Sequence, residues 1–428
     1  MASPLVVQKY GGTSVNGPDR IRAVAEHVVE TRRAGHEVLV VVSAMGDTTD
    51  DLFGLAHQVS ATPSPRELDM LLTAGERISM ALLSMAIIDL GESAVSYTGS
   101  QAGIVTDTSH GRARIVELRA ERLRAALDDG KVVIVAGFQG VSTDLDVTTL
   151  GRGGSDTTAV ALAHVLGAEA CEIYTDVAGV YTADPRVVPE ARKLERVSYE
   201  EMLEMAASGG RVLALRSVEF ARNYGVPLQV RSSFTWEPGT WVLPMHEAEA
   251  EAAAEELEDP TMEQAIISGV THDTTEAKLT IERVPDRPGI AARVFRALAD
   301  AEVNVDMIVQ NVSHAGTTDI SFTIPKADLA PATDTCEKLV VEIEAEGFQT
   351  DVAIGRVSLV GAGMKSHPGV AAQMFETLAS EGINIEMIST SSIRISIVVR
   401  ESDVERAVQV LHSSFELAGT PAGAAGAS

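Results

Sequence analysis

Up to about residue 245, short apolar runs alternate with amphipathic stretches. Residues 37–45 (EVLVVVSAM) form a continuous apolar run, which is typical of a parallel strand buried on both faces. Residues 18–35 have a helical pattern, with Pro18 near the start and Gly35 after the end. The same reasoning predicts further buried strands at residues 5–9, 131–140, 170–177 and 226–233. The alternation predicts a three-layer α/β domain with a mainly parallel central sheet.

A duplicated module follows this region. Residues 286–308 and 366–388 align at a constant offset of 80, which pairs Gly289 with Gly369 and Asn304 with Asn384. Each copy reads strand, Pro-Gly turn, helix, turn, strand, which predicts two ferredoxin-like βαββαβ modules. The predicted organisation is an α/β domain at 1–245, an acidic linker at 246–261, modules at 262–350 and 351–418, and a disordered tail at 419–428.

Composition narrows the class of partner. The formal net charge is −27, which argues against a nucleic-acid or anionic-membrane binder. Eight acidic residues fall within residues 247–263, typical of a solvated linker. The sequence has no apolar run of about 18 residues and no signal-peptide pattern. Cys171 and Cys336 suit a reducing compartment, so we expect a cytoplasmic protein.

Three glycine-containing segments are candidates for phosphate chemistry. The sequence contains no P-loop, and residues 151–156 (GRGGSD) fail the dinucleotide pattern because Asp156 takes the place of the last glycine. The first segment, residues 8–15 (QKYGGTSV), ends a strand with a lysine and two glycines. The second, residues 148–159, leads three glycines and Arg152 into a helix start, where free amides favour anions. The third, residues 174–186, follows another strand; alone it would read as an ordinary polar hairpin. Ligands bind beyond the carboxyl ends of parallel strands, so the three together predict a ligand crevice.

Five motifs of the sequence, three of them overlapping these segments, resemble aspartate kinase, a member of the amino-acid kinase fold with two C-terminal ACT modules. They are KYGGTSV, LLTAGERIS, TGSQAG, GRGGSDTTAVALA and YTDVAGVYTADPR, in the family's usual order. The resemblance implies ATP-dependent phosphorylation of L-aspartate to 4-phospho-L-aspartate, the entry to lysine, threonine and methionine synthesis. Two alternatives stay open: a kinase of the same fold acting on glutamate or acetylglutamate, and a non-catalytic amino-acid sensor.

The resemblance also implies residue roles. Lys9 would neutralise the transferring phosphate and Asp156 would organise the lysine or a metal around it. Arg152 would hold the α-carboxylate of aspartate and Glu76 its ammonium group. Mg²⁺ would bridge the ATP phosphates with few direct protein ligands, so no metal-ligand set is assigned. The implied ATP contacts are Lys9, Tyr10, Gly11, Gly12, Ser43, Thr175, Asp176, Tyr181, Asp184, Pro185, Arg186 and Arg211, and the implied substrate contacts are Asp47, Thr48, Thr49, Glu76, Arg152, Gly153, Gly154 and Ser155.

Three positions depart from the family pattern. Arg211 stands where the family usually has lysine, and Ala178 where an aspartate is common. In the second module Ser392 replaces a glutamate, which predicts weakened feedback, mainly by threonine. The implied effectors are lysine and threonine, and their contacts would be Asp286, Arg287, Pro288, Gly289, Ile290, Ala291, Asn304, Val305, Asp306, Gln310, Val370, Ala371, Asn384, Ile385, Ser391 and Ser392.

The modules also predict an oligomer, because each presents an apolar face or sheet edge. Some members of the family make the regulatory half separately from an internal start, which gives an α2β2 assembly. Met262, between the linker and the first module, is the candidate start here.

Overall fold

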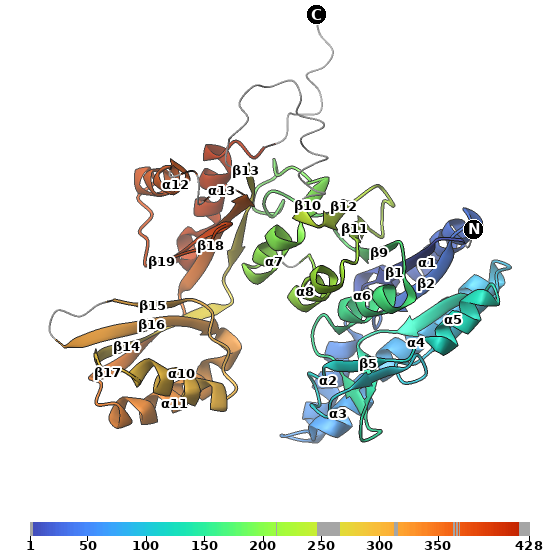
Figure 1. The fold of residues 1–428 in the computed structure, drawn as a ribbon, viewed down its shortest axis with the longest axis horizontal. Coiled ribbons are helices and arrows are strands. Elements are labelled where there is room, and N and C mark those ends of the chain that lie inside the picture. The colour runs from blue at the N-terminus through green and yellow to red at the C-terminus, as the bar shows by residue number, and fades with distance from the viewer. Residues whose placement is uncertain are drawn as a thin grey trace, which may run out of the picture. The chain divides into compact units, whose positions relative to one another are not determined.

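The computed structural model describes residues 3–210, 212–245, 266–311, 316–362, 364, 367 and 369–418. These residues fall into two compact units (Figure 1). The first unit is drawn from residues 1–180, 193–207 and 211–260, and the second from residues 181–192, 208–210 and 261–428. Arg211, Met262, the predicted linker and the predicted tail lie outside the described residues.

The first unit is built on an eight-stranded sheet in the order β10-β12-β11-β9-β1-β2-β6-β3. All neighbouring strands are parallel except β11 and β12. The predicted α/β class with a mainly parallel sheet is therefore confirmed. The strands are β1 (Leu5–Tyr10), β2 (Glu37–Val42), β3 (Ala94–Tyr97), β6 (Val132–Ala136), β9 (Ala170–Thr175), β10 (Arg196–Ser198), β11 (Leu228–Ser232) and β12 (Thr240–Leu243).

The apolar run at residues 131–140 is not one strand, as the sequence predicted. Strand β6 ends at Ala136, and Phe138 then adopts a left-handed backbone with φ of 68°. The chain turns there into β7 (Gln139–Ser142), which belongs to a separate four-stranded sheet with β4 (Ile104–Thr106), β5 (Ile115–Leu118) and β8 (Val147–Thr149). A left-handed residue cannot continue a strand, so this turn separates the two sheets.

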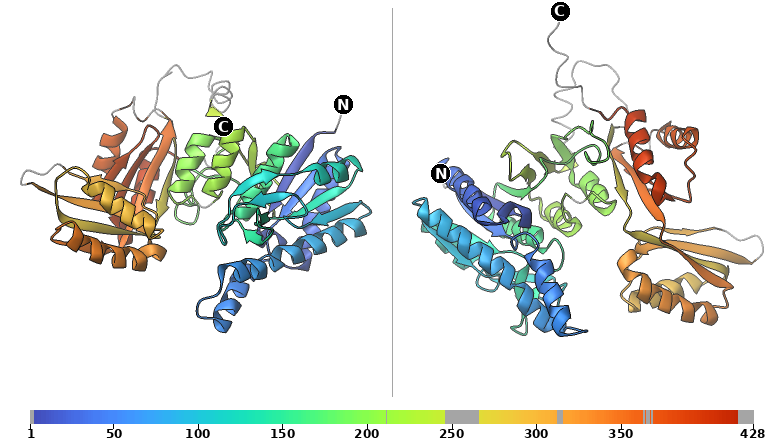
Figure 2. Two further views of the ribbon diagram at one scale, coloured as in Figure 1. Left: turned by 60° about the horizontal axis from the view of Figure 1, so that its bottom comes forward. Right: turned by 180° about the vertical axis from the view of Figure 1, so that it is seen from behind.

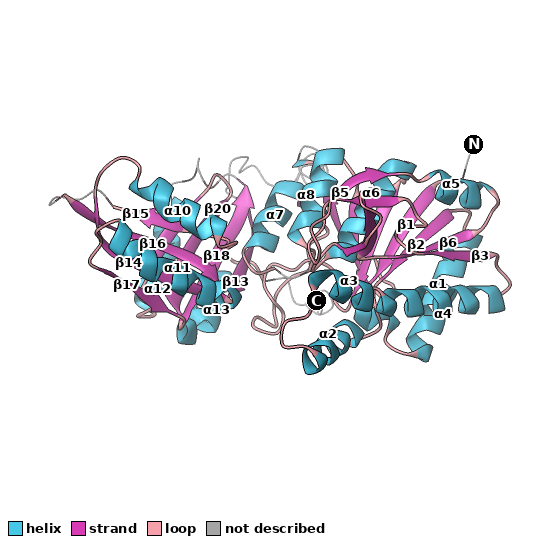
Figure 3. Ribbon diagram, turned by 90° about the horizontal axis from the view of Figure 1, so that it is seen from below, coloured by secondary structure: helices cyan, strands magenta, loops and turns pink. Residues whose placement is uncertain are grey.

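Helices cover both faces of the large sheet (Figure 3). One face carries α1 (Pro18–Arg33) and α4 (Ala74–Asp89), and the other carries α5 (Glu121–Asp128) and α6 (Gly154–Leu166). Between α1, α4 and the sheet lies a core of Val, Ile and Leu residues. The other helices of this unit are α2 (Thr48–Val59), α3 (Pro65–Leu72), α7 (Tyr199–Ala207) and α8 (Leu215–Tyr224).

Helices α3 and α4 follow one another along the chain with only Thr73 between them, and together they form a helical stretch of 25 residues, Pro65–Asp89 (Figure 2). Among the described residues, this stretch alone has the length and hydropathy of a membrane span, and 44% of its most apolar window is buried inside the protein. A helix in the core of a globular protein meets the same criterion.

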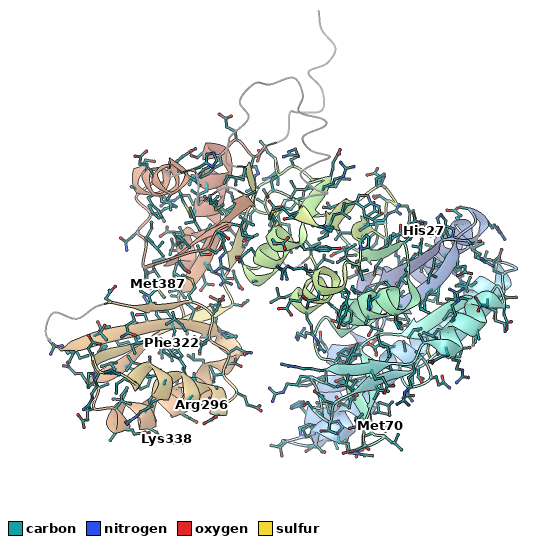
Figure 4. All side chains as sticks on the ribbon, viewed as in Figure 1. His27, Met70, Arg296, Phe322, Lys338 and Met387 are labelled. Atoms are coloured by element: carbon teal, nitrogen blue, oxygen red, sulfur yellow. The ribbon has the colours of Figure 1, made fainter. Side chains whose placement is uncertain are left out.

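The second unit contains two four-stranded sheets, in the orders β15-β16-β14-β17 and β13-β18-β20-β19. Phe322 of β16 is fully buried and packs against Phe295 of α10 (Figure 4). The elements of the first module are β14 (Glu276–Pro285), α10 (Ile290–Asp300), β15 (Ile308–Gln310), β16 (Thr317–Pro325), α11 (Leu329–Glu342) and β17 (Gly347–Asp351). The elements of the second module are β13 (Ile266–Asp273), β18 (Ile354–Ala362), α12 (Gly369–Ser380), β19 (Met387–Thr390), β20 (Arg394–Arg400) and α13 (Val404–Ser414).

The repeat does not show how the strands are distributed between the two modules. Strand β13 precedes the first module in sequence, yet it pairs with β18 of the second. The first module takes its fourth strand, β17, from its own C-terminal end. The second module therefore consists of two separated pieces of chain, and the first module is inserted between them.

Candidate active site

An ion pair stands at the carboxyl end of the central strand. Lys9 is the penultimate residue of β1, and its Nζ lies 2.6 Å from Oδ1 of Asp156 in the first turn of α6. Both side chains are 11% exposed. No described residue donates a hydrogen bond to this Oδ1 with good geometry. The pair therefore places a nearly buried ammonium beside a carboxylate that can still accept a ligand, at the strand end where α/β sheets bind ligands.

The loops after β1 and β2 approach each other closely at Gly12. A side-chain carbon added there would lie 3.0 Å from the carbonyl oxygens of Ala44 and Gly46. The Gly46 N–H donates to the Gly12 carbonyl at 3.0 Å, and the Ser43 N–H donates to the Tyr10 carbonyl at 3.0 Å. Any larger residue at position 12 would crowd these carbonyls, so glycine suits this close approach of the two strand ends.

Glu76 is a buried carboxylate beside the end of β2. It lies in the first turn of α4 and is 3% exposed. The Ala44 N–H donates to its Oε1 at 3.2 Å, while Oε2 has no hydrogen-bond partner among the described residues. Burial raises the pKa of Glu76 to about 7, although two backbone hydrogen bonds act in the opposite direction. A buried carboxylate with an unused oxygen is a suitable partner for a cationic group.

The second glycine segment turns into α6 as expected. Gly151 and Gly153 have φ of 78° and 72°, and α6 begins at Gly154. A side-chain carbon on Gly153 would lie 2.3 Å from the Cβ of Ala214, so glycine is required there for space as well as for φ. Arg152 lies between the two left-handed glycines and is exposed, while Ser155 is buried. This loop presents a guanidinium beside a helix start, a position that favours anions.

Two expected nucleotide contacts face elsewhere. The Tyr10 side chain is fully buried on the α1 side of the sheet, stacked on Tyr174, because successive residues of a strand point to opposite faces. Tyr174 in turn bonds to His27 of α1 (Figure 4). The Gly11 N–H donates to the Tyr174 carbonyl at 3.2 Å, so it is not free for a phosphate. The nucleotide role of Tyr10 and Gly11 stays a prediction.

The other predicted contacts are spread over several elements. Asp47 precedes α2 without a side-chain capping hydrogen bond, and the Thr48 hydroxyl donates to the Met45 carbonyl at 2.6 Å, with Thr49 following in α2. Thr175 ends β9 and its hydroxyl donates to Asp176 at 3.0 Å. Tyr181, Asp184, Pro185 and Arg186 belong to the second unit, where Asp184 pairs with Arg186 at 2.7 Å. Their nucleotide role stays a prediction.

Seven of the predicted effector residues line one cavity of about 320 Å³ in the first module. The cavity lies where β14 turns into α10 and is completed by Thr318 and Ile320 of β16. Asp306 instead pairs with the buried Arg356 of β18. In the second module Val370 is buried, whereas Ser391 and Ser392 are exposed in the turn between β19 and β20. The cavity-lining effector residues are Asp286, Arg287, Pro288, Gly289, Ile290, Ala291 and Gln310.

Sequence analysis missed Asp69, a nearly fully buried carboxylate (1% exposed). It lies in α3, seven residues or about two helical turns before Glu76 of α4, and only Thr73 separates the two helices. That spacing was the available signal. Asp69 lies outside the five motifs that carry the resemblance, so those motifs do not point to it.

Comparisons with known proteins agree with this architecture. The model of the amino acid kinase family matches residues 4–232, and the ACT domain model matches residues 282–339 and 357–415. The aspartokinases of Corynebacterium efficiens and Mycobacterium tuberculosis are 56% and 57% identical to this chain, each over 97% of both proteins.

Solved structures give the same result. That of E. coli aspartokinase III in complex with aspartate and ADP matches with a TM-score of 0.79 and 27% identity, over 96% of this chain and 100% of the other. The same enzyme in complex with lysine and aspartate matches with a TM-score of 0.70, over 96% of this chain and 99% of the other. Together these similarities show that the chain belongs to the aspartokinase family.

Proposed function

We propose that the site at the carboxyl ends of β1 and β2 transfers the γ-phosphoryl group of ATP to the β-carboxylate of L-aspartate. The proposal rests on one observation, that an ion pair and a buried carboxylate both lie at this site. The Lys9–Asp156 ion pair stands at the start of α6, and Glu76 lies buried with an unused oxygen beside the end of β2. Phosphoryl transfer depends mainly on positioning and charge neutralisation, which these residues supply.

Each group has one role in this reaction. An oxygen of the substrate β-carboxylate attacks the γ-phosphorus, the bond to the β–γ bridging oxygen breaks, and ADP leaves with that electron pair. The carboxylate is already ionised at neutral pH, so the step needs no general base. Lys9 neutralises the charge on the transferring group, and Asp156 holds its ammonium in place. Glu76 receives the substrate ammonium, while Arg152 and Ser155 receive its α-carboxylate.

Mg²⁺ fits this site as an ion carried by the nucleotide. Among the described residues there is no cluster of three His, Cys, Asp or Glu side chains that would hold a metal. The Asp156 carboxylate, whose Oδ1 lies 2.6 Å from Lys9 Nζ, is the residue that would contact the ion. When bound, Mg²⁺ supplies positive charge at the β- and γ-phosphates.

A hydroxamate assay tests the function. The protein is incubated with Mg·ATP, hydroxylamine and either aspartate, glutamate or acetylglutamate, and we expect aspartyl hydroxamate alone. Product with glutamate or acetylglutamate would favour another amino-acid kinase. No product with any acceptor, together with binding of lysine or threonine, would favour the sensor.

The buried Thr182 links the segment of predicted nucleotide contacts to the second ACT module inside the second unit. Its hydroxyl lies 2.9 Å from His412 Nε2 of α13, donates to the Leu417 carbonyl and accepts from the Arg192 N–H. We propose that lysine and threonine, when bound to the ACT modules, change nucleotide binding through the contact between Thr182 and α13. Thr182→Val should cost about 1–3 kcal/mol of unfolding free energy and weaken feedback about fivefold or more.

Inhibition curves for lysine and threonine, with chemical denaturation, check this prediction. Thr335→Val is the matched control, because the Thr335 hydroxyl donates within α11 to Pro331. Unchanged inhibition of Thr182→Val at normal kcat would contradict the coupling.

Ser392 gives a second prediction on feedback. It is exposed in the turn after β19, where the Ile393 N–H donates to Ser391 Oγ. A carboxylate at 392 would offer an effector ammonium a charge-assisted hydrogen bond, worth ~1.5–3 kcal/mol, or roughly ten- to a hundredfold in affinity. Ser392→Glu should therefore strengthen threonine inhibition by that factor. Strong threonine inhibition of the unmodified protein, unchanged in Ser392→Glu, would show that residue 392 only shapes the turn.

We further propose a cytoplasmic oligomer, either of this chain alone or with a regulatory subunit begun at Met262. The paired ACT modules support this proposal. Native mass spectrometry of the protein expressed from its full gene should show a second, shorter chain in the assembly. A single chain species would contradict the separate regulatory subunit and favour an oligomer of this chain alone.

A further inference from the structure

We propose that Asp69 is a positioning residue that sets the spacing between the two charges that recognise the amino acid, Glu76 and Arg152. This inference rests on the proposed function. It concerns a buried group that has no role in the chemistry above. Asp69 belongs to α3, in the same 25-residue helical stretch as Glu76, and the two are 1% and 3% exposed.

The Asp69 carboxylate binds two segments from elsewhere in the chain. The Thr149 hydroxyl at the end of β8 donates to Oδ1 at 2.5 Å. The Gly111 N–H donates to both carboxylate oxygens at 3.1 Å, and His110 Nδ1 lies 2.7 Å from Oδ2. A single buried side chain thus receives hydrogen bonds from β8 and from the loop between β4 and β5. If the Asp69 carboxylate is replaced, both segments lose their hydrogen bonds to it at the same time.

These two segments hold the loop that carries Arg152. Thr149 is three residues before Arg152, and its carbonyl accepts from the Ala113 N–H at 2.9 Å. Arg216 donates to the carbonyls of Leu150 and Ala113, both at 3.0 Å. A side-chain carbon on Gly151 would lie 3.0 Å from the Gly111 carbonyl, so the two segments are in direct contact. The position of Arg152 is therefore determined relative to Asp69.

The consequence concerns recognition of the substrate. The helical stretch fixes Glu76 relative to Asp69, and Asp69 fixes β8 and the start of the Arg152 loop. Glu76 and Arg152 would grip the ammonium and the α-carboxylate of the amino acid, whose distance apart is set by chemistry. A displacement of about 1 Å in such a grip costs up to about 100-fold in rate or apparent affinity. ATP makes no use of this grip, so its KM should respond much less.

The test is Asp69→Asn, which keeps the shape but places an amide N–H₂ where a carboxylate oxygen accepts. We expect the KM for aspartate to rise about 10- to 100-fold, with the KM for ATP changed less than about threefold. Asp128→Asn is the matched control, since the exposed Asp128 of α5 pairs with Arg124 of the same helix. It should leave both KM values unchanged. Thr149→Val, which removes one donor, provides a milder variant if Asp69→Asn does not fold.

A double-mutant cycle separates positioning from general loss of structure. If Asp69 acts through Arg152, Asp69→Asn should add less than about threefold to the KM for aspartate once Arg152→Ala is present. Equal rises in the KM for aspartate and for ATP, or full additivity with Arg152→Ala, would overturn the inference. An unmodified protein without aspartate-dependent activity would instead overturn the proposed function.

Discussion

Replacing Lys9 with alanine is expected to lower kcat about 100- to 1000-fold while the protein stays folded. Lys9 is the nearly buried cation at the end of β1, paired with Asp156. A preorganised charge at the site where negative charge develops contributes ~2.7–4 kcal/mol to the transition state. The loss should fall on kcat, because a neutral side chain removes that stabilisation without blocking either substrate. Steady-state kinetics with aspartate and ATP, with circular dichroism for folding, measure the effect.

Four further variants sharpen this test. Lys131→Ala, at an exposed lysine that pairs with Asp129, should leave kcat unchanged. Asp156→Ala should also lower kcat strongly, and the double variant should lose less than the product of both effects, since the two groups act as a unit. Lys9→Arg should not restore full activity, because a forked guanidinium replaces a compact ammonium. A folded Lys9→Ala protein with near-normal kcat would show that the cation has no role in transfer.

Glu76→Gln is expected to raise the KM for aspartate about 100-fold or more and to change the pH profile. Burial raises the pKa of Glu76 to about 7, so the carboxylate becomes protonated as the pH falls below that value. The protonated acid cannot pair with the substrate ammonium. For the unmodified protein, kcat/KM for aspartate should therefore fall about tenfold per pH unit below about 7. In Glu76→Gln this limb should disappear, because the amide does not titrate.

The same substitution should stabilise the free protein at high pH. The folded pKa of Glu76 lies above the ordinary value of 4.5, so ionising it opposes folding as the pH rises through 4.5 towards 7. Above pH 7 this opposition is about 3 kcal/mol, at 1.36 kcal/mol per pKa unit. Glu76→Gln should thus raise the unfolding free energy at pH 8 and leave it nearly unchanged at pH 4.

Chemical denaturation at the two pH values measures this effect, with exposed Glu67→Gln on α3 as the control. A Glu76→Gln protein that keeps its aspartate KM and its acid limb would remove Glu76 from the binding site.

Local features of the sequence predicted much of the candidate site. The apolar run of β2, the lysine at the end of β1 and the glycines before α6 each act within a few residues of chain. Their spacing therefore indicates the local backbone conformation without reference to distant residues. The repeat offset of 80 likewise predicted two related modules, because it compares the chain with itself.

Tertiary structure decided the features that depend on distant partners. The side of the sheet that Tyr10 faces follows from strand alternation, but its burial depends on α1 and β9. Strand β13 completes the sheet of the second module by pairing with β18, and residues 181–192 belong to the same unit. Both arrangements depend on residues that are far away in the sequence. Asp69 acquires its role only when β8 and the β4–β5 loop reach it. Periodicity encodes which face of an element is buried, whereas the partner that buries it is chosen by long-range packing.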